Sequence, residues 1–176
     1  MDNLISKEYK EKIVKKHKKN HWGGNIERNM PDTILKYMNL SRATSILDYG
    51  AGYGAFKKAM EGLPGHIYIH EYEPGIIGKD EDPPICDATV CFDVLEHIEP
   101  DKIDNVLKHI YNKTRFWAIL NICTLPAHNT FPDGQNLHLI VKDSSWWVRK
   151  LLGYWNILEI IKTKGHVKLL LTKNKS

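Results

Sequence analysis

One stretch of the sequence decides the fold: Ile46-Leu47-Asp48-Tyr49-Gly50-Ala51-Gly52-Tyr53-Gly54. An apolar strand ends in an acid, and three glycines follow at alternate positions. Because glycine tolerates positive φ and has no Cβ, the backbone at Gly50 and Gly52 can approach a ligand that any side chain would displace. The helix expected next points its first N–H groups at the same ligand. The stretch therefore predicts a strand, turn and helix that receive a nucleotide-like ligand.

The spacing of the glycines narrows the kind of ligand. A dinucleotide-binding fingerprint reads G-x-G-x-x-G, and its third glycine is set by helix packing below a pyrophosphate. Here the order is G-x-G-x-G behind an acid, which argues against a dinucleotide. The alternative is a glycine-rich turn that binds nothing.

A carboxylate follows at the end of the next expected strand. Ribose hydroxyls are commonly bound by an acid roughly 20 residues past the glycines, and Glu73 lies 19 residues after Gly54. Pro74 ends the strand and fixes Glu73 at the carboxyl edge of the sheet, where ligands of open α/β sheets bind. Glu71 is the competing acid, two residues deeper on the same face.

A third polar cluster follows another strand. The segment Cys91-Phe92-Asp93-Val94-Leu95-Glu96-His97 leaves an apolar strand at Phe92 and precedes a helix expected over residues 100–111. Its polar residues fall on the loop that faces the same edge of the sheet.

These three motifs, in this order, resemble those of the class I S-adenosylmethionine (AdoMet)-dependent methyltransferases, and the match covers residues 43 to about 123. The resemblance implies AdoMet as cofactor. Its methionine end would lie among Asp48 and the glycines, and its ribose at Glu73. The cofactor-binding residues so implied are Asp48, Gly50, Ala51, Gly52, Glu73, Pro74, Phe92 and Asp93.

The resemblance has a gap between Glu73 and Ala88. Residues 75–87 are too few for the usual helix and third strand, whose end commonly supplies an acid to the adenine amine. Asp80, Asp82 or Asp87 would substitute for it, or Phe92 would pack against the ring. Residues 82–85 read D-P-P-I and resemble the D-P-P-Y motif of amino-group DNA methyltransferases only in part, because an aliphatic residue occupies the stacking position.

The rest of the chain completes an α/β fold. Strands and helices alternate from residue 43 to residue 123, which predicts a Rossmann-like, doubly wound, mostly parallel sheet. Strands over 155–161 and 166–171 form a hairpin that adds an antiparallel C-terminal strand. We expect one methyltransferase domain over residues 1–176, with a helical extension over 1–42, an AdoMet-binding core over 43–176 and a shortened third-strand region.

Composition sets further bounds. Of 176 residues, 42% are hydrophobic and 26% charged, as in ordinary globular proteins. No run approaches about 18 apolar residues and the start has no leader-like pattern, so a cytoplasmic protein without a membrane partner is expected. The three cysteines form no C-x-x-C pair, which favours reduced thiols.

Seven lysines crowd the first twenty residues. They indicate either the solvated face of a helix, with Ile5, Tyr9 and Ile13 as its apolar stripe, or a surface that meets nucleic acid or an acidic partner. Trp22, beside two glycines, either closes over the cofactor or packs in a turn.

Methyl transfer needs a positioned acceptor and, for a hydroxyl or protonated amine, a base. His97 is the first candidate. Further candidates are His128, Asp133 and His138, which share a polar loop after the strand that ends at Cys123. The three histidines have no short ligand spacing, so no metal is expected.

The sequence thus predicts an AdoMet-dependent methyltransferase acting on a small molecule or an exposed end of a larger one. The alternatives are a nucleic-acid methyltransferase, an AdoMet-cleaving enzyme, a regulatory AdoMet binder, or an interaction protein that has lost the cofactor. The sequence does not define the oligomeric state.

Overall fold

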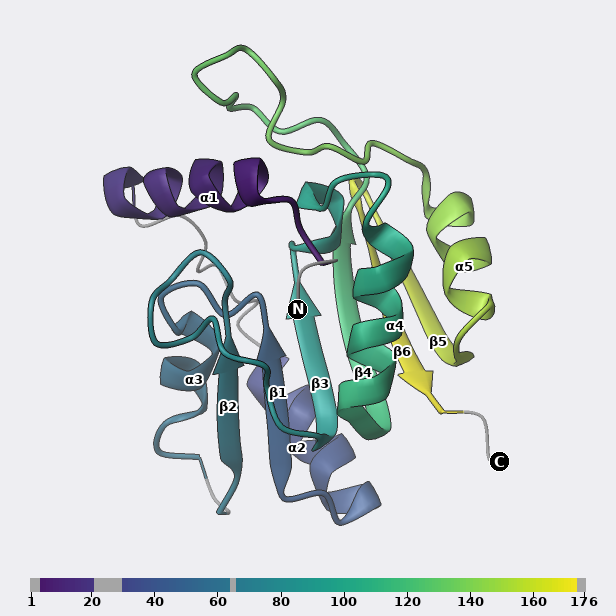
Figure 1. The fold of residues 1–176 in the computed structure, drawn as a ribbon. Helices are drawn as coiled ribbons and strands as arrows, with labels where there is room; N and C mark the ends of the chain where they lie inside the picture. The colour runs from purple at the N-terminus through teal and green to yellow at the C-terminus, as the bar shows by residue number, and fades with distance from the viewer. Residues whose placement is uncertain (1–3, 21–29, 64–65, 174–176) are drawn as a thin grey trace.

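A computed structural model describes residues 4–20, 30–63 and 66–173 (Figure 1). The helices are α1 (Lys7–Asn20), α2 (Met30–Ser41), α3 (Ala55–Met60), α4 (Ile103–Lys113) and α5 (Ser144–Leu152), with a 3₁₀ turn, η1, at Leu95–His97. The strands are β1 (Ser45–Tyr49), β2 (Tyr68–Tyr72), β3 (Cys86–Phe92), β4 (Thr114–Cys123), β5 (Asn156–Thr163) and β6 (His166–Thr172).

The six strands form one sheet in the order β2-β1-β3-β4-β6-β5. The first four in that order are parallel, whereas β6 runs antiparallel to β4 and to β5. Residues 73–85 contain no strand, so β2 forms the edge of the sheet. The predicted mostly parallel sheet, its C-terminal hairpin and its shortened third-strand region are confirmed.

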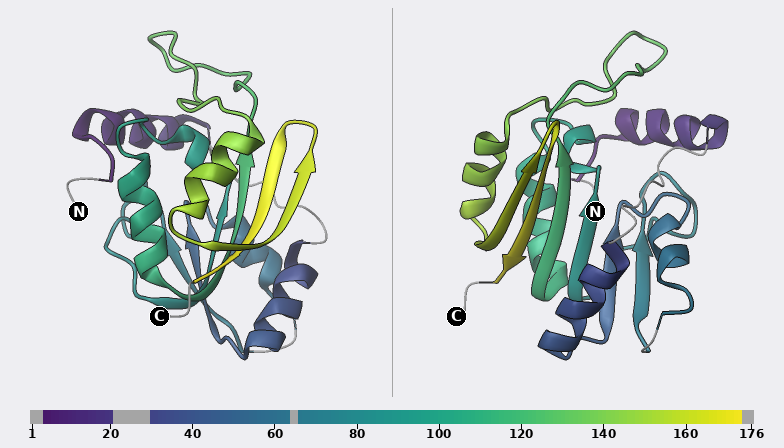
Figure 2. Two further views of the ribbon diagram at one scale, coloured as in Figure 1. Left: turned by 90° about the vertical axis from the view of Figure 1, so that its right-hand side faces the viewer. Right: turned by 180° about the vertical axis from the view of Figure 1, so that it is seen from behind.

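Alternate residues of the strands bury two separate apolar cores. On β1, Leu47 packs with residues of α4 and α5, while its neighbour Ile46 packs with residues of α2 and α3. Both side chains are fully buried, as expected for a parallel strand covered on both faces. Figure 2 shows α4 and α5 on the opposite side of the sheet from α2. The doubly wound arrangement predicted from the alternation is therefore confirmed.

Helix α1 and the loop over residues 124–143 lie at the carboxyl edge of the parallel strands (Figure 1). Tyr9 and Ile13 of α1 are buried against Phe131 and Leu137 of that loop, and Ile5 packs beside them. The predicted apolar stripe of the lysine-rich helix is confirmed by these contacts. No helix among residues 4–20, 30–63 and 66–173 is long and apolar enough to cross a membrane.

Candidate active site

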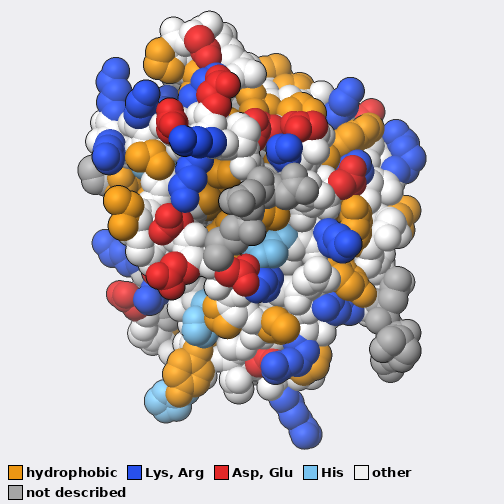
Figure 3. Space-filling model, viewed as in Figure 1, with side chains coloured by type: hydrophobic (Ala, Val, Ile, Leu, Met, Phe, Trp, Pro, Cys, Tyr) orange, Lys and Arg blue, Asp and Glu red, His pale blue; other side chains and the backbone are white. Residues whose placement is uncertain are grey.

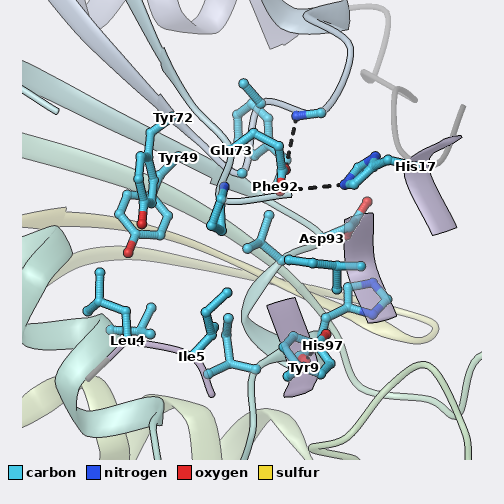
Figure 4. Close-up of a pocket in the computed structure, with 18 residues that line it drawn as sticks. Leu4, Ile5, Tyr9, His17, Tyr49, Tyr72, Glu73, Phe92, Asp93 and His97 are labelled. Atoms are coloured by element: carbon cyan, nitrogen blue, oxygen red, sulfur yellow. Dashed lines mark hydrogen bonds and ion pairs between the residues drawn. The ribbon is translucent and has the colours of Figure 1, made fainter. Parts of the chain in front are cut away.

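A cavity of about 360 Å³ opens at the carboxyl edge of the sheet, within the range of small-molecule and cofactor sites. Its walls come from the turn after β1, the segments that follow β2 and β3, and helix α1 (Figure 4). The three motifs that the sequence places in order along the chain thus meet around one space. Parallel strands explain this, because their carboxyl ends share one edge.

The glycine turn is held by the neighbouring strand. The N–H groups of Gly50 and Ala51 donate to the carbonyl of Tyr72 at 2.8 and 3.0 Å. Gly50 and Gly52 have φ of 82° and 49°, a region that favours glycine. A Cβ at Gly50 would collide with Val94, so the protein's own packing already requires glycine there. Gly50, Ala51 and Gly52 all line the cavity.

Glu73 is buried and forms one wall of the cavity. One carboxylate oxygen accepts from the N–H of Gly52 at 3.2 Å, and the other accepts from the N–H of Gly75 at 3.0 Å. His17 Nε2 lies 3.5 Å from the second oxygen (Figure 4). A carboxylate has about four acceptor positions, so these contacts orient Glu73 and leave capacity for ligand hydroxyls. Pro74 lines the cavity beside it.

The competing acid, Glu71, is engaged elsewhere. Its carboxylate lies 2.8 Å from Lys79 Nζ and 3.6 Å from Lys57 Nζ. Glu71 is not among the described residues that line the cavity. The geometry therefore favours Glu73 over Glu71 as the acceptor for a bound sugar.

Asp48 lies at the end of β1 and is buried. Its Oδ2 has no hydrogen-bond partner among the described residues. Burial, followed by the charge of Glu71, raises the pKa of this carboxyl to about 7. A buried acceptor without a partner costs free energy. Asp48 directly precedes Tyr49 and the glycine turn, but it is not among the described residues that line the cavity.

This raised pKa predicts how stability depends on pH. The unfolded chain loses the Asp48 proton near the usual pKa of 3.8, whereas the folded protein holds it to about 7. The free energy of unfolding therefore falls as the pH rises from about 4 to about 7. Asp48→Asn removes this titration. We expect the free energy of unfolding of the variant, relative to that of the wild type, to be higher at pH 8 than at pH 5 by on the order of 2 kcal/mol. Urea unfolding without AdoMet measures this, and an equal difference at both pH values would contradict it.

The end of β3 supplies the remaining cofactor candidates. Phe92 lines the cavity and packs edge-on against Phe56. Asp93, which also lines the cavity, has a left-handed φ of 54°, a conformation that aspartate tolerates better than most residues. Asn121 fixes it, because its carbonyl accepts from the Asp93 N–H at 2.8 Å and its side-chain amide donates to Asp93 Oδ1 at 3.0 Å.

Three acids considered for the adenine lie outside the cavity lining. Asp80 pairs with Lys10, Asp82 pairs with His109 and Lys113, and Asp87 accepts from the N–H of Thr44. Of the candidates for the adenine contact, Phe92 alone borders the cavity. Ile85, at the stacking position of the D-P-P-I segment, is 57% exposed and also lies outside it.

Helix α1 covers the cavity. Tyr9, Ile13 and His17 of this helix line it, as do Leu4 and Ile5 just before the helix. Helix α1 of the N-terminal extension thus forms one wall of the cavity. Trp22 lies outside the described residues.

The catalytic candidates separate into two groups. His97 lines the cavity, and its ring packs against that of His138 with 4.7 Å between the ring centroids. Burial lowers the pKa of His97 to about 4, so the ring is neutral near pH 7. His128 and Asp133 are exposed, and Asp133 pairs with Lys12 at 2.8 Å. The structure therefore brings together His97 and His138 but leaves His128 and Asp133 on the outer part of the loop.

Sequence reasoning missed the aromatic side of the cavity. Tyr49 and Tyr72 line it, with ring centroids 4.8 Å apart. They are the last residues of β1 and β2 and pair in register. The sequence offers one signal for them, because Tyr49 directly precedes Gly50 and Tyr72 directly precedes Glu73. However, only the register of the two strands shows that the tyrosines are neighbours.

Comparisons with solved structures identify the fold. The chain matches Burkholderia thailandensis 1,6-didemethyltoxoflavin-N1-methyltransferase, crystallised with its substrate and S-adenosylhomocysteine, with a TM-score of 0.69 and 12% identity over 96% of this chain and 90% of that one. It also matches DhpI in complex with SAH (TM-score 0.59, 11% identity, 96% and 95% covered). A third match is the small RNA methyltransferase HEN1 (TM-score 0.61, 11% identity, 88% of this chain and 27% of that one).

No family model matches the sequence, and a search of curated proteins found no significant match. The Burkholderia and HEN1 structures are both of methyltransferases, and the Burkholderia and DhpI structures both hold S-adenosylhomocysteine. The chain has the fold of the class I AdoMet-dependent methyltransferases.

Proposed function

We propose that this protein binds AdoMet in the cavity at the carboxyl edge of the sheet and transfers its methyl group to an acceptor. One observation carries the proposal: the glycine turn, the buried carboxylate of Glu73 and the end of β3 line the same 360 Å³ space. The bare backbone at Gly50 and Gly52 suits a ligand that approaches closely.

Methyl transfer from a sulfonium needs no enzyme nucleophile. The protein must hold the acceptor near the methyl carbon and exclude water. Helix α1, whose Tyr9 hydroxyl donates to the carbonyl of His97 at 2.5 Å, closes the cavity on the side of that histidine. The His97 ring at the cavity wall is neutral near pH 7 and is our candidate to receive an acceptor's proton, although its low pKa makes it a weak base.

Calorimetry with AdoMet and with S-adenosylhomocysteine tests the first half of the proposal. We expect saturable binding of both at one site per chain. Absence of binding by either ligand would refute the proposal and leave an interaction protein with a vestigial fold. Incubation with AdoMet alone separates the remaining alternatives: cleavage without an acceptor indicates a lyase, and tight binding with no turnover across many acceptors indicates a regulatory binder.

A small molecule or an exposed end of a larger one is the acceptor that we favour. The Burkholderia enzyme was crystallised with the small molecule 1,6-didemethyltoxoflavin bound, and among the described residues of the present chain helix α1 and the segment just before it cover the cavity. Such a compact cover suits an acceptor that enters end-on.

A nucleic-acid acceptor is the second candidate. Lys15, Lys18 and Lys19 of α1 are exposed beside the cavity, and Figure 3 shows lysine and arginine side chains gathered over that helix. Lys10 and Lys12 are instead paired with Asp80 and Asp133. Phosphate contacts would make oligonucleotide binding fall steeply with salt, so a titration at two salt concentrations decides: binding that is weak or independent of salt removes this candidate.

A further inference from the structure

Three side chains from distant parts of the chain meet next to the cavity. Glu96 and His97 belong to η1, and His138 belongs to the loop after β4. One ligand atom of each lies within 4.8 Å of those of the other two. Only His97 also lines the cavity, so the cluster stands at the cavity wall.

The carboxylate of Glu96 is unusual for its depth. The residue is fully buried, and its Oε1 accepts from the N–H of Cys123 at 3.0 Å. Its Oε2 has no hydrogen-bond partner among the described residues. Buried carboxylates are normally paired with a charge or bound to a metal. No lysine or arginine forms an ion pair with Glu96 in the described part of the chain, so its second oxygen is open to a bound cation.

Both imidazoles are oriented as metal ligands usually are. His97 Nδ1 lies 2.8 Å from the carbonyl of Leu137, and His138 Nδ1 lies 2.5 Å from the carbonyl of Leu125. A carbonyl oxygen only accepts, so each Nδ1 carries a proton, and Nε2 of each ring is the atom that can bind a metal ion. A hydrogen bond from the second ring nitrogen to a carbonyl fixes the tautomer and orientation of metal-bound histidines.

We propose that Glu96, His97 and His138 bind a divalent transition-metal ion. Two imidazoles and one carboxylate suit ions such as Zn²⁺, Fe²⁺ or Co²⁺ and not Mg²⁺, which prefers oxygen ligands. Three protein ligands leave at least one coordination position open, as catalytic zinc sites do. The bond lengths of about 2.0–2.2 Å require small torsional adjustments of the three side chains.

The position of His97 gives the ion a role. This step rests on the proposed methyl transfer: an ion at the cavity wall would bind an oxygen of the acceptor in its open position and orient it. Metal coordination also lowers the pKa of a bound hydroxyl group, so the acceptor's proton would pass to solvent, and His97 would then act as a ligand of the ion and not as the base considered above. The class of acceptor that fits is a hydroxyl-bearing molecule.

Titration of metal-free, full-length protein with Co²⁺ tests the site without reference to AdoMet. We expect one Co²⁺ per chain with visible absorption bands, and a change of those bands when azide is added to fill the open position. Glu96→Gln keeps the acceptor for Cys123 and His138→Phe keeps the ring contact with His97. Each should weaken Co²⁺ binding at least about 100-fold, since loss of outer-shell partners alone costs 10–100-fold.

His128→Ala is the matched control, because His128 lies in the same loop but outside the cluster. It should bind Co²⁺ as the wild type does. The proposal is overturned if the wild type binds no Co²⁺ at one site per chain, or if the control loses as much affinity as the cluster variants. Bands that azide leaves unchanged would overturn the open position and the acceptor role. AdoMet binding to the metal-free protein is measured separately and tests the proposed function. The metal site and the proposed methyl transfer can therefore be refuted independently of each other.

Discussion

Gly52→Val is expected to abolish AdoMet binding while leaving a folded protein. Gly52 lines the cavity, and its N–H donates to Glu73 at 3.2 Å. A branched side chain would occupy the space that the ligand needs and would disfavour the φ of 49°. We expect the affinity to fall at least about 100-fold, which corresponds to about 2.7 kcal/mol. Calorimetry with S-adenosylhomocysteine measures the loss.

The backbone cost of a valine at positive φ needs its own control. Gly134 has a φ of 84° and lies in the outer loop, and a Cβ added there would meet no heavy atom within 4 Å. Gly134→Val carries a similar conformational cost, on the order of 1–3 kcal/mol, away from the cavity. If both variants lose the same amount of stability but only Gly52→Val loses cofactor binding, the result supports a cofactor site at the glycine turn. Undiminished affinity in Gly52→Val would refute the placement of the cofactor against this turn.

Much of the fold was predictable because the strands carry strong local signals. Residues 46–49 begin with two apolar residues, end in Asp48 and Tyr49, and are followed by glycines. Local sequence therefore predicts both the strand and the residue at which it ends. Helix α5 begins at Ser144, directly after Asp143, a residue type that commonly caps helices, and the Asp143 carboxylate accepts from the N–H of Trp146 at 2.7 Å. The order of the motifs then places the cavity, because parallel strands present their carboxyl ends together.

Element boundaries were less predictable where turns compete with helices. Pro100 favours the first turn of a helix, yet α4 begins at Ile103. The N–H of Lys102 donates to the carbonyl of Glu99 at 2.8 Å, so a turn occupies the residues before the helix. Strand β3 begins at Cys86 and has a register irregularity between Cys86 and Ala88.

The grouping of the histidines could not be predicted from the sequence. His97 and His138 are 41 positions apart. A tertiary contact holds the loop that carries His138 beside His97, because the N–H of Ile140 donates to the carbonyl of Glu96 at 2.9 Å. His128, only ten positions before His138, is exposed instead. The expectation of no metal relied on ligand spacing along the chain, and spacing carries no information about ligands brought together by a loop.

Glu73→Ala is expected to weaken AdoMet binding by about 1.5–3 kcal/mol, or roughly 10- to 150-fold, as for hydrogen bonds to a charged group. The loss has two sources. The ribose would lose its acceptor, and the N–H groups of Gly52 and Gly75 would lose the carboxylate that orders both segments. Glu73→Gln separates these sources, because one amide oxygen still accepts from one N–H while the negative charge is gone.

Glu71→Ala is the matched control for that experiment. Glu71 is two residues away and paired with Lys79 and Lys57, outside the cavity lining. Lys79 also donates to the carbonyl of Gly52 at 2.9 Å, so a small indirect effect on the turn is expected, well below that of Glu73→Ala. A larger loss at Glu71 than at Glu73 would move the sugar to the other acid. Since Glu71 lies deeper in the sheet beside Gly54, such a result would also shift the whole ligand toward α3 and away from Phe92.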